Sequence, residues 1–282
     1  MTSPFSAHPS LRGRVIIITG ASRGIGREFA RALAQAGAKL ALVASHITDA
    51  FRVTDTEVRA LAAPGSVLTL PADIRDPATC ERVVKQTAEE FGALHGLINN
   101  AGVGMRLFSE TFNTEPVNFW EGSAENWQTV IDTNTLAPFF MARAAAPLMI
   151  QGGFGRIVSV STSPMTMVRR GYSPYGPSKA ALEAMTRVWA QDLAGTGVTA
   201  NIILPGGATD TEFLPTRGER RGADGQLLAP NIMNHALLWL LSDAANDVTG
   251  RRIVGKLWDT SLPPDEAAAK AMPPTVKMPN IL

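Results

Sequence analysis

Short runs of valine, isoleucine and leucine recur along the chain, and stretches with helical periodicity separate them. The apolar residues within each run are nearly continuous, which is typical of parallel strands that helices cover on both faces. This alternation predicts βαβ units in a doubly wound, three-layer α/β fold built on a seven-stranded parallel sheet. The predicted strands are 14–19, 39–44, 66–70, 95–99, 156–160, 198–204 and 251–255.

The domain organisation follows from the absence of an internal repeat or a long linker in the first 258 residues. The sequence therefore predicts a single domain over 1–282 with its core at about 12–258. The tail, 259–282, carries five prolines that exclude a long helix or a central strand, so we expect it to wrap the surface or a neighbouring subunit. Two long segments, 103–122 and 206–230, are predicted to be loops that act as lids or binding elements.

Composition and charge exclude several classes of partner. The 282 residues are 45% hydrophobic and 18% charged, and the formal net charge is +1, so no overall field favours nucleic acid or an anionic membrane. The single cysteine, Cys80, has no partner for a disulfide or a zinc site and indicates a reducing compartment. The chain shows no secretory leader and no apolar run of membrane-spanning length, so we expect a cytoplasmic protein without a metal.

A glycine-rich turn, TGASRGIG at 19–26, follows the first predicted strand and opens the first predicted helix. Glycine permits a tight turn, and the free N–H groups at a helix start attract a pyrophosphate. The placement after a strand and before a helix favours a dinucleotide site in a Rossmann-type fold, whereas an ordinary βα turn is the alternative. The expected cofactor contacts in this turn are Gly20, Ser22, Arg23, Gly24, Ile25 and Gly26.

The end of the second predicted strand bears on the choice of dinucleotide. NAD-binding folds carry an acidic residue there for the ribose 2′-hydroxyl, but this strand ends in ALVASHI without an acid. Arg23 in the glycine turn supplies a cation for a 2′-phosphate, and Ser45 and His46 add hydrogen-bond donors. The sequence thus favours NADP(H), with NAD(H) as the alternative cofactor and a solvent-exposed loop position as the alternative for His46.

Several further motifs occur in a characteristic order, and together they are far more specific than any one alone. With these motifs the chain resembles the short-chain dehydrogenase/reductase (SDR) family from residue 12 to about 258. The resemblance implies an NAD(P)-dependent oxidoreductase that interconverts a carbonyl and a secondary alcohol. The motifs are TGASRGIG, ADI at 72–74, NNAG at 99–102, Asn134 in DTNTLAPFF, GRIVSVSTS at 155–163, YGPSK at 175–179, LPGG at 204–207 and DVTG at 247–250.

The resemblance assigns roles along the cofactor. It implies that Asn134 holds a proton-relaying water and that Lys179 holds the hydroxyls of the nicotinamide ribose. A threonine should bond the carboxamide, and both Thr209 and Thr211 are eligible, with Thr211 preferred. The other implied cofactor contacts are Asp73 and Ile74 at the adenine, Asn100, Ala101 and Gly102 after the fourth strand, Tyr175 at the reacting centre, and Pro205 and Gly206 near the nicotinamide.

The segment YGPSK places Tyr175 four residues before Lys179. Residues at this spacing share one helical face, and a nearby cation favours the phenolate. An unperturbed tyrosine has a pKa of about 10, so we expect Lys179 to lower the pKa of Tyr175 and to make it a general acid/base. Pro177 suits the first turn of a helix. The alternative is a helix start that carries a surface lysine.

The hydroxyl that polarises the substrate carbonyl is a serine in the family pattern, thirteen residues before the tyrosine. Here that position is Thr162, and Ser163 follows it as the reserve donor. A threonine can donate the same hydrogen bond, although its β-branch restricts χ1. Two other activities stay open: a low-turnover dinucleotide-binding sensor, and a dehydratase or epimerase on the same scaffold.

The substrate and the oligomeric state are predicted from softer signals. Apolar side chains in the loops favour an apolar or aromatic carbonyl compound. Arg169 and Arg170 either bind a substrate carboxylate or are solvated. The helices expected at 137–147 and 180–194 are rich in small residues, and the resemblance implies a homodimer or homotetramer built on them. The expected pocket walls are Met105, Trp120, Met165, Met167, Tyr172 and Phe213.

Overall fold

A computed structural model describes residues 10–215, 220 and 225–274. The seven predicted strands all form, and they make one parallel sheet with the order β3-β2-β1-β4-β5-β6-β7. The predicted bounds differ from the observed ones by no more than one residue at any strand end. The strands are β1 (Val15–Thr19), β2 (Lys39–Ala44), β3 (Val67–Pro71), β4 (Gly96–Asn99), β5 (Gly155–Val160), β6 (Val198–Leu204) and β7 (Arg252–Val254).

The order of the strands reverses direction at β1, which pairs with β2 on one side and with β4 on the other. The chain runs outward from β1 to β3 and then returns to place β4 beside β1. Ligands of open α/β sheets bind at such a switch point, in the crevice beyond the carboxyl ends of the strands. The topology therefore places the loops that follow β1 and β4 next to each other.

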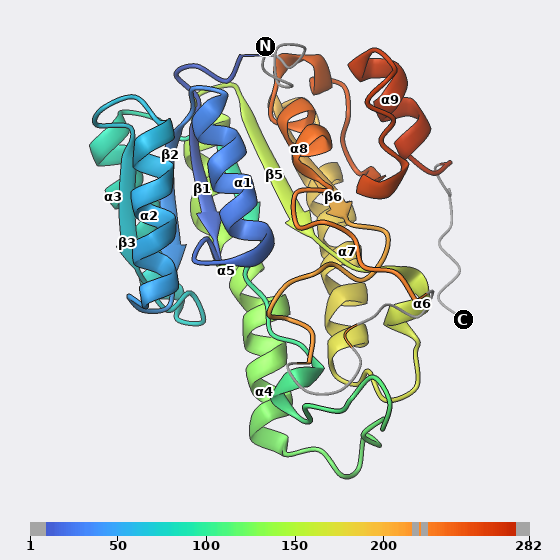
Figure 1. The fold of residues 1–282 in the computed structure, drawn as a ribbon. Helices are drawn as coiled ribbons and strands as arrows, with labels where there is room; N and C mark the ends of the chain where they lie inside the picture. Colours follow the sequence, from blue (N-terminus) through green and yellow to red (C-terminus); the bar gives the residue numbers. More distant parts are fainter. Residues whose placement is uncertain (1–9, 216–219, 221–224, 275–282) are drawn as a thin grey trace.

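Two layers of helices cover the sheet, as Figure 1 shows. Alternate residues of β1 face opposite sides: Ile16 and Ile18 join one buried cluster, and Val15 and Ile17 join the other. The first cluster packs against α1, α2, α8 and α9, and the second against α3, α5 and α7. The helices are α1 (Gly24–Gln35), α2 (Asp49–Leu61), α3 (Pro77–Phe91), α4 (Ala124–Ile131), α5 (Ala137–Gln151), α6 (Pro164–Met167), α7 (Tyr175–Asp192), α8 (Asn234–Leu240) and α9 (Pro264–Ala271).

The ends of α3 show how local sequence fixes a helix. Asp76 accepts hydrogen bonds from the backbone N–H groups of Ala78 and Thr79, and Pro77 occupies the first helical turn. Gly92 ends the helix with a φ of 80°, in the left-handed region that glycine tolerates best. These terminal residues fix where α3 begins and ends, while its buried residues Cys80, Val83 and Val84 pack in the core.

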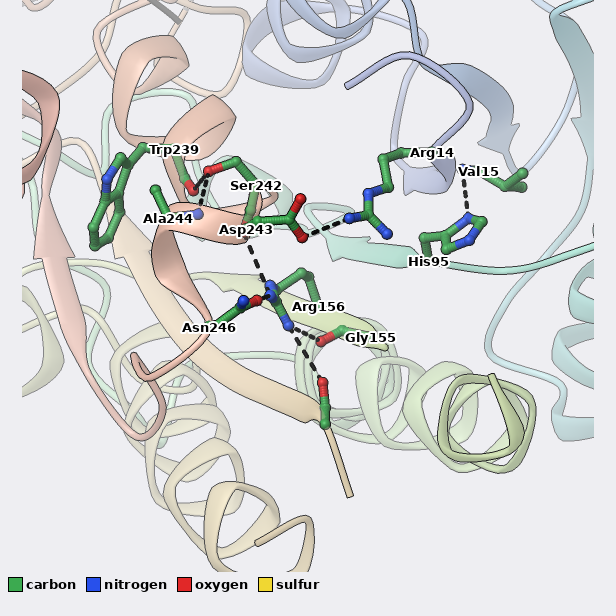
Figure 2. Close-up of polar contacts among 11 residues, drawn as sticks. Arg14, Val15, His95, Gly155, Arg156, Trp239, Ser242, Asp243, Ala244 and Asn246 are labelled. Atoms are coloured by element: carbon green, nitrogen blue, oxygen red, sulfur yellow. Dashed lines mark hydrogen bonds and ion pairs between the residues drawn. The ribbon is translucent and has the colours of Figure 1, made fainter. Parts of the chain in front are cut away.

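A buried arginine ties together the amino end of the sheet, opposite the switch-point crevice (Figure 2). Arg156 at the start of β5 is 1% exposed and donates hydrogen bonds to the carbonyls of Gly155, Gly197 and Ser242 and to the Asn246 amide oxygen. Burial lowers the pKa of Arg156 to about 10. The guanidinium thus joins β5 to the segments before β6 and after α8.

The tail contributes to the core, which extends beyond the boundary expected at residue 258. Pro264 begins α9, and Ala267, Ala268 and Ala271 are buried in the cluster that holds α1 and α8. The Trp239 indole N–H also donates to Asp265 at 2.7 Å. The prolines exclude a long helix, as expected, but they permit this short one. Pro279 lies outside the described residues.

The two predicted loops contain little regular structure. Within 103–122 the only helical segment is a 3-10 turn, Met105–Leu107. The segment packs on the loop before α7, because a Cβ at Gly171 would lie 2.5 Å from Pro116. Within 206–230, Thr209 forms an isolated parallel bridge with Leu228, and the Leu228 N–H donates to the Ala208 carbonyl. Residues 216–219 and 221–224 lie outside the described residues.

Candidate active site

A cleft of about 660 Å³ lies along the carboxyl edge of the sheet. The turns after β1, β3, β4, β5 and β6 line it together with the start of α7. The lining includes every residue predicted to be catalytic or to bind the cofactor, except His46 and Asn134. The topology therefore gathers into one cavity residues that are more than 180 positions apart in the sequence.

The glycine turn is held against the loop after β4. Gly20 has a φ of 65°, and a Cβ at Gly26 would lie 2.6 Å from the Asn100 side-chain nitrogen and closer still to the Gly20 carbonyl oxygen. The Asn100 amide donates to the Thr19 and Gly20 carbonyls, and the Thr19 hydroxyl accepts the N–H groups of Asn100 and Ala101. Only glycine fits at position 26, so the turn is shaped by close backbone approach as expected.

Two arginines that line the cleft lie in the turns after β1 and β3. Arg23 pairs with Glu212 at 2.7 Å, and both side chains are more than half exposed. Arg75 pairs with Asp73 and lowers the pKa of that carboxyl. Arg75 was not predicted, although its place two residues after the ADI motif could have drawn attention to it.

His46 does not line the cleft, although Ser45 does. The His46 ring nitrogen Nδ1 lies 2.8 Å from the Ser45 hydroxyl. The exposed position of His46 agrees with the alternative that the sequence offered for it. Ser45 remains the residue of this pair that could contact a cofactor.

Tyr175 and Lys179 lie on the same face at the start of α7, and both line the cleft. Burial raises the pKa of Tyr175 to about 12, and a side-chain hydrogen bond with Thr162 acts in the opposite direction. The prediction that Lys179 lowers the pKa of Tyr175 was wrong. Within the protein, desolvation of the phenolate outweighs any attraction to the Lys179 ammonium.

Lys179 is almost fully buried, and its ammonium donates to the Val160 carbonyl at 2.9 Å. Burial lowers the pKa of Lys179 to about 8, although Glu183 acts in the opposite direction. The lysine is therefore fixed under the cleft by the end of β5. A surface lysine, the alternative from the sequence, does not describe this position.

Asn134 lies beneath the cleft, in a π-helical turn at Asp132–Leu136 that joins α4 to α5. Its side chain is fully buried and exchanges two hydrogen bonds of 2.9 Å with the backbone of Val103. It also donates to the Ser178 hydroxyl at 3.0 Å. Single π turns in helices often mark functional sites. Asn134 thus connects the loop after β4 to the start of α7.

The candidate polarising hydroxyls are separated by their partners. Ser163 caps α6, since its hydroxyl accepts the Thr166 N–H and lies 2.9 Å from the Thr166 hydroxyl. Thr162 instead lies near enough to Tyr175 to oppose the rise of its pKa, and the Thr162 carbonyl accepts a 2.6 Å hydrogen bond from Arg252. Glu183 pairs with Arg252 at 3.0 Å. This arrangement favours Thr162 over Ser163 as the group next to the reacting oxygen.

The loop after β6 carries both candidate threonines into the cleft wall. Pro205 and Gly206 begin this loop, and Gly206 has a φ of 90°. The Thr211 hydroxyl lies 3.5 Å from the Thr209 carbonyl, whereas the Thr209 hydroxyl is buried without a partner in the described part of the chain. The preference for Thr211 has no support from these contacts, because Thr209 has the free hydrogen-bonding capacity.

The substrate end of the cleft differs in part from the expected set of walls. Met105, Tyr172 and Phe213 line the cleft, and the Phe213 ring lies 5.4 Å from the Tyr175 ring. The other expected walls do not line it: Trp120 is 69% exposed and Met165 is 77% exposed. Met167 and Arg170 are also absent from the lining, which includes Arg169, Phe112, Asn113, Thr129, Thr133 and Thr166.

A family model described as short chain dehydrogenase matches residues 14–222, which include the glycine turn and the Tyr175–Lys179 pair. The chain belongs to the short chain dehydrogenase family. Members of this family are NAD(P)-dependent oxidoreductases acting on CH–OH or C=O groups, and this protein is an enzyme of that class. The predicted family, fold and class of enzyme are thereby confirmed.

Individual relatives of this short chain dehydrogenase span most of its length. It is 30% identical over 250 residues to 3-oxoacyl-(acyl-carrier-protein) reductase FabG of Escherichia coli, with 86% of this chain and 96% of the relative covered. It is 34% identical over 204 residues to the NADPH-dependent aldehyde reductase-like protein, chloroplastic, of Arabidopsis thaliana, with 70% and 73% covered. A crystal structure of a short-chain type dehydrogenase/reductase from Mycobacterium marinum matches with a TM-score of 0.75 at 28% identity, covering 89% and 97%.

The residues of this short chain dehydrogenase fit a nicotinamide dinucleotide. The absence of a Cβ at Gly26 lets the glycine turn close against Gly20 and Asn100 at the cleft, and the Ser161 and Thr209 hydroxyls are buried at the cleft without partners among the described residues. Within those same residues, no group of three His, Cys, Asp or Glu side chains could hold a metal ion. No helix that the structure describes has the length and apolar character needed to cross a membrane.

Proposed function

We propose that this short chain dehydrogenase is an NADP(H)-dependent enzyme that reduces a ketone or aldehyde carbonyl, or oxidises the secondary alcohol, with Tyr175 as general acid/base. The observation that carries the proposal is that Tyr175, Thr162 and Lys179 line one cleft together with the glycine turn, with Thr162 near enough to Tyr175 to oppose the rise of its pKa. A carbonyl oxygen placed between these two hydroxyls would receive both hydrogen bonds.

Each residue in the cluster has a separate task. Thr162 donates a hydrogen bond to the carbonyl oxygen and stabilises the negative charge that develops there. Tyr175 delivers its phenolic proton to that oxygen, and its raised pKa keeps it protonated at neutral pH. The bound nicotinamide supplies or accepts the hydride. Lys179 and Asn134 position the start of α7. Lys179 would return a proton to the Tyr175 phenolate, and a water held by Asn134 would relay protons to Lys179.

The cofactor residues are proposed from the lining of the cleft. Gly20, Ser22, Gly24, Ile25 and Gly26 would hold the pyrophosphate at the start of α1. Asp73 and Ile74 would border the adenine, and Asn100, Ala101, Gly102, Pro205 and Gly206 would line the path to the nicotinamide. Thr209, with Thr211 beside it, would bond the carboxamide.

NADP(H) is preferred over NAD(H) in this proposal because cations and hydroxyls surround the position of the adenosine ribose. Arg23, Arg75 and Ser45 line the cleft, and no acid stands at the end of β2. A guanidinium binds a phosphate well, and an acid would bind the free 2′-hydroxyl instead. The Arabidopsis relative is named as an NADPH-dependent protein, which agrees with this choice.

The remaining parts of the proposal concern the substrate and the environment. Met105, Phe112 and Phe213 make the substrate end largely apolar, which favours an apolar or aromatic carbonyl compound. The buried Cys80 suits a cytoplasmic protein. Exposed apolar residues on α5, Phe139 and Ile150, support a homodimer or homotetramer that uses this helix.

The test is a panel of ketones and aldehydes in which NADPH consumption is followed by absorbance. We expect turnover by the wild-type enzyme and a loss of at least about hundredfold in kcat for Tyr175→Phe, since general acid catalysis contributes about that much. Fluorescence titration should show that Tyr175→Phe still binds NADPH.

Three outcomes would contradict this proposal. Full activity of Tyr175→Phe would remove the tyrosine from the mechanism. Stoichiometric NADPH binding by the wild-type enzyme with no turnover of any compound would favour a dinucleotide sensor. Conversion of a substrate without net change in the cofactor would indicate a dehydratase or epimerase.

A further inference from the structure

The arginines that line the cleft differ in their partners. Three arginine side chains line the cleft, and two of them pair with carboxylates: Arg23 with Glu212 and Arg75 with Asp73. Arg169 lines the substrate end and has no carboxylate partner within the part of the chain that the structure describes. An arginine left without an acid beside a reacting centre is available to a charged ligand.

Neighbouring side chains hold Arg169 in place. Its guanidinium lies 4.8 Å from the centre of the Tyr172 ring and donates to the Tyr172 hydroxyl at 3.4 Å. That hydroxyl in turn donates to Asn113 at 2.8 Å, and Phe112 contacts the edge of the same ring. The segments before α7 and after β4 therefore orient Arg169 together. Because a cation over an aromatic face is stabilised, the guanidinium is held where it lines the cleft.

We propose that Arg169 binds a carboxylate of the carbonyl substrate, so that the substrates of this enzyme are oxo acids with an apolar or aromatic body. The inference rests on the proposed carbonyl reduction and names its substrate class. The planar guanidinium donates two parallel hydrogen bonds to a carboxylate, which fixes the orientation of the acid as well as its charge. Phe112, which contacts Tyr172, and Phe213, which contacts Tyr175, line the same cleft and offer apolar surface to the body of the substrate.

The position of Arg169 makes the interaction sensitive to salt. The side chain is exposed on the outer side, so its attraction to an anion is screened at high ionic strength. An acid substrate should therefore lose affinity as salt is added, whereas its uncharged ester should not. Arg170 is the adjacent residue with the same charge, but it does not line the cleft, which makes it a matched control.

The experiment compares wild-type enzyme with Arg169→Gln and Arg170→Gln. The probes are benzoylformate, para-formylbenzoate and benzoylpropionate, each measured beside its methyl ester with NADPH. These acids differ in the separation of carbonyl and carboxylate, so the series also finds the length that suits the site. For the best acid we expect Arg169→Gln to raise KM about ten- to hundredfold with little change in kcat. The esters, and the Arg170→Gln enzyme, should show unchanged KM values.

The inference fails if Arg169→Gln changes acids and esters equally, or if Arg170→Gln gives the same effect. It also fails if wild-type enzyme reduces the esters and discriminates against every acid, although the proposed carbonyl reduction would then stand. Calorimetric titration of the acids into the enzyme with NADP⁺ tests the opposite case, in which the carboxylate site is present but the enzyme does not reduce these carbonyls. Binding of an acid by wild type and not by Arg169→Gln, without turnover of any probe, would support the carboxylate site and count against the reductase. Equal binding by both would overturn the carboxylate site.

Discussion

The ion pair between Arg23 and Glu212 connects the glycine turn to the loop after β6 across the cleft. The Glu212 carbonyl also accepts a 2.7 Å hydrogen bond from Arg106 in the loop after β4. Exposed ion pairs contribute about 0–1 kcal/mol, so Glu212 holds Arg23 only weakly. A 2′-phosphate, with nearly two negative charges, should displace the carboxylate and take over the guanidinium.

Replacing Arg23 should therefore change the choice of cofactor. We expect Arg23→Gln to weaken NADPH binding about tenfold, because one charge-assisted hydrogen bond to the phosphate is lost. NADH binding should change less than about twofold, because that cofactor has no phosphate at this position. Fluorescence titration with both dinucleotides measures the ratio, and Arg170→Gln controls for the loss of one positive charge. Equal weakening of both cofactors would assign Arg23 to the pyrophosphate instead.

At the residue scale, motif spacing predicted the members of the site better than their electrostatics. Tyr175, Lys179 and Thr162 meet in the cleft because a helix brings positions four apart together and β5 ends beside α7. The direction of the Tyr175 pKa shift was missed because spacing carries no information on desolvation. Trp120 and Met165 were wrongly placed for a related reason: loop conformation depends on contacts that no periodicity encodes.

At the scale of elements, the amino ends of β1, β4 and β5 share the basic residues Arg14, His95 and Arg156 (Figure 2). All three contact the Phe154 ring. The guanidinium carbons of Arg14 and Arg156 lie 3.6 and 3.9 Å from the centre of that ring, and Asp243 pairs with Arg14 at 2.6 Å. His95 packs edge-on to the same ring. Its Nδ1 accepts the backbone N–H of Val15 at 3.0 Å, so the cluster requires a neutral imidazole.

This requirement predicts a loss of stability in mild acid. Burial, and then the charge of Arg14, lowers the pKa of His95 below its ordinary value of 6.5. As the pH falls through about 6.5, the unfolded chain binds the proton first, so the free energy of unfolding decreases until the lower folded pKa is passed. His95→Asn keeps an acceptor for Val15 and cannot titrate. Urea midpoints against pH should fall less for His95→Asn than for wild type, with His46→Asn as control; parallel curves would contradict the assignment.

Elements with continuous apolar runs were the most predictable. All seven strands form. Every residue of β5 and β6, for example, is buried, and burial on both faces makes most of their residues apolar. The π turn around Asn134 could not be predicted, because it depends on the hydrogen bonds of one side chain to Val103 and Ser178. The asparagine itself was identified only by its motif.

At the scale of the whole molecule, the C-terminal helix closes one face of the fold. The helix α9 packs against α8, and three of its alanines enter the core that also contains α1. The sequence suggested a surface tail because prolines surround this segment. Pro264, however, occupies the first turn of α9, where its missing N–H costs no hydrogen bond. A helix of eight residues is too short to show its buried face clearly in the sequence.

The contribution of α9 can be tested with two adjacent alanines. Ala268 is fully buried and Ala269 is exposed, so Ala268→Asp and Ala269→Asp place the same charge on opposite faces of one helix. We expect Ala268→Asp to reduce the free energy of unfolding by about 3 kcal/mol or more, since an unpaired carboxylate would lose its water. Ala269→Asp should change it by less than about 0.5 kcal/mol. Urea denaturation measures both values, and equal effects would show that α9 is peripheral. No residue of α9 lines the cleft, so NADPH affinity of the folded Ala268→Asp enzyme should match wild type.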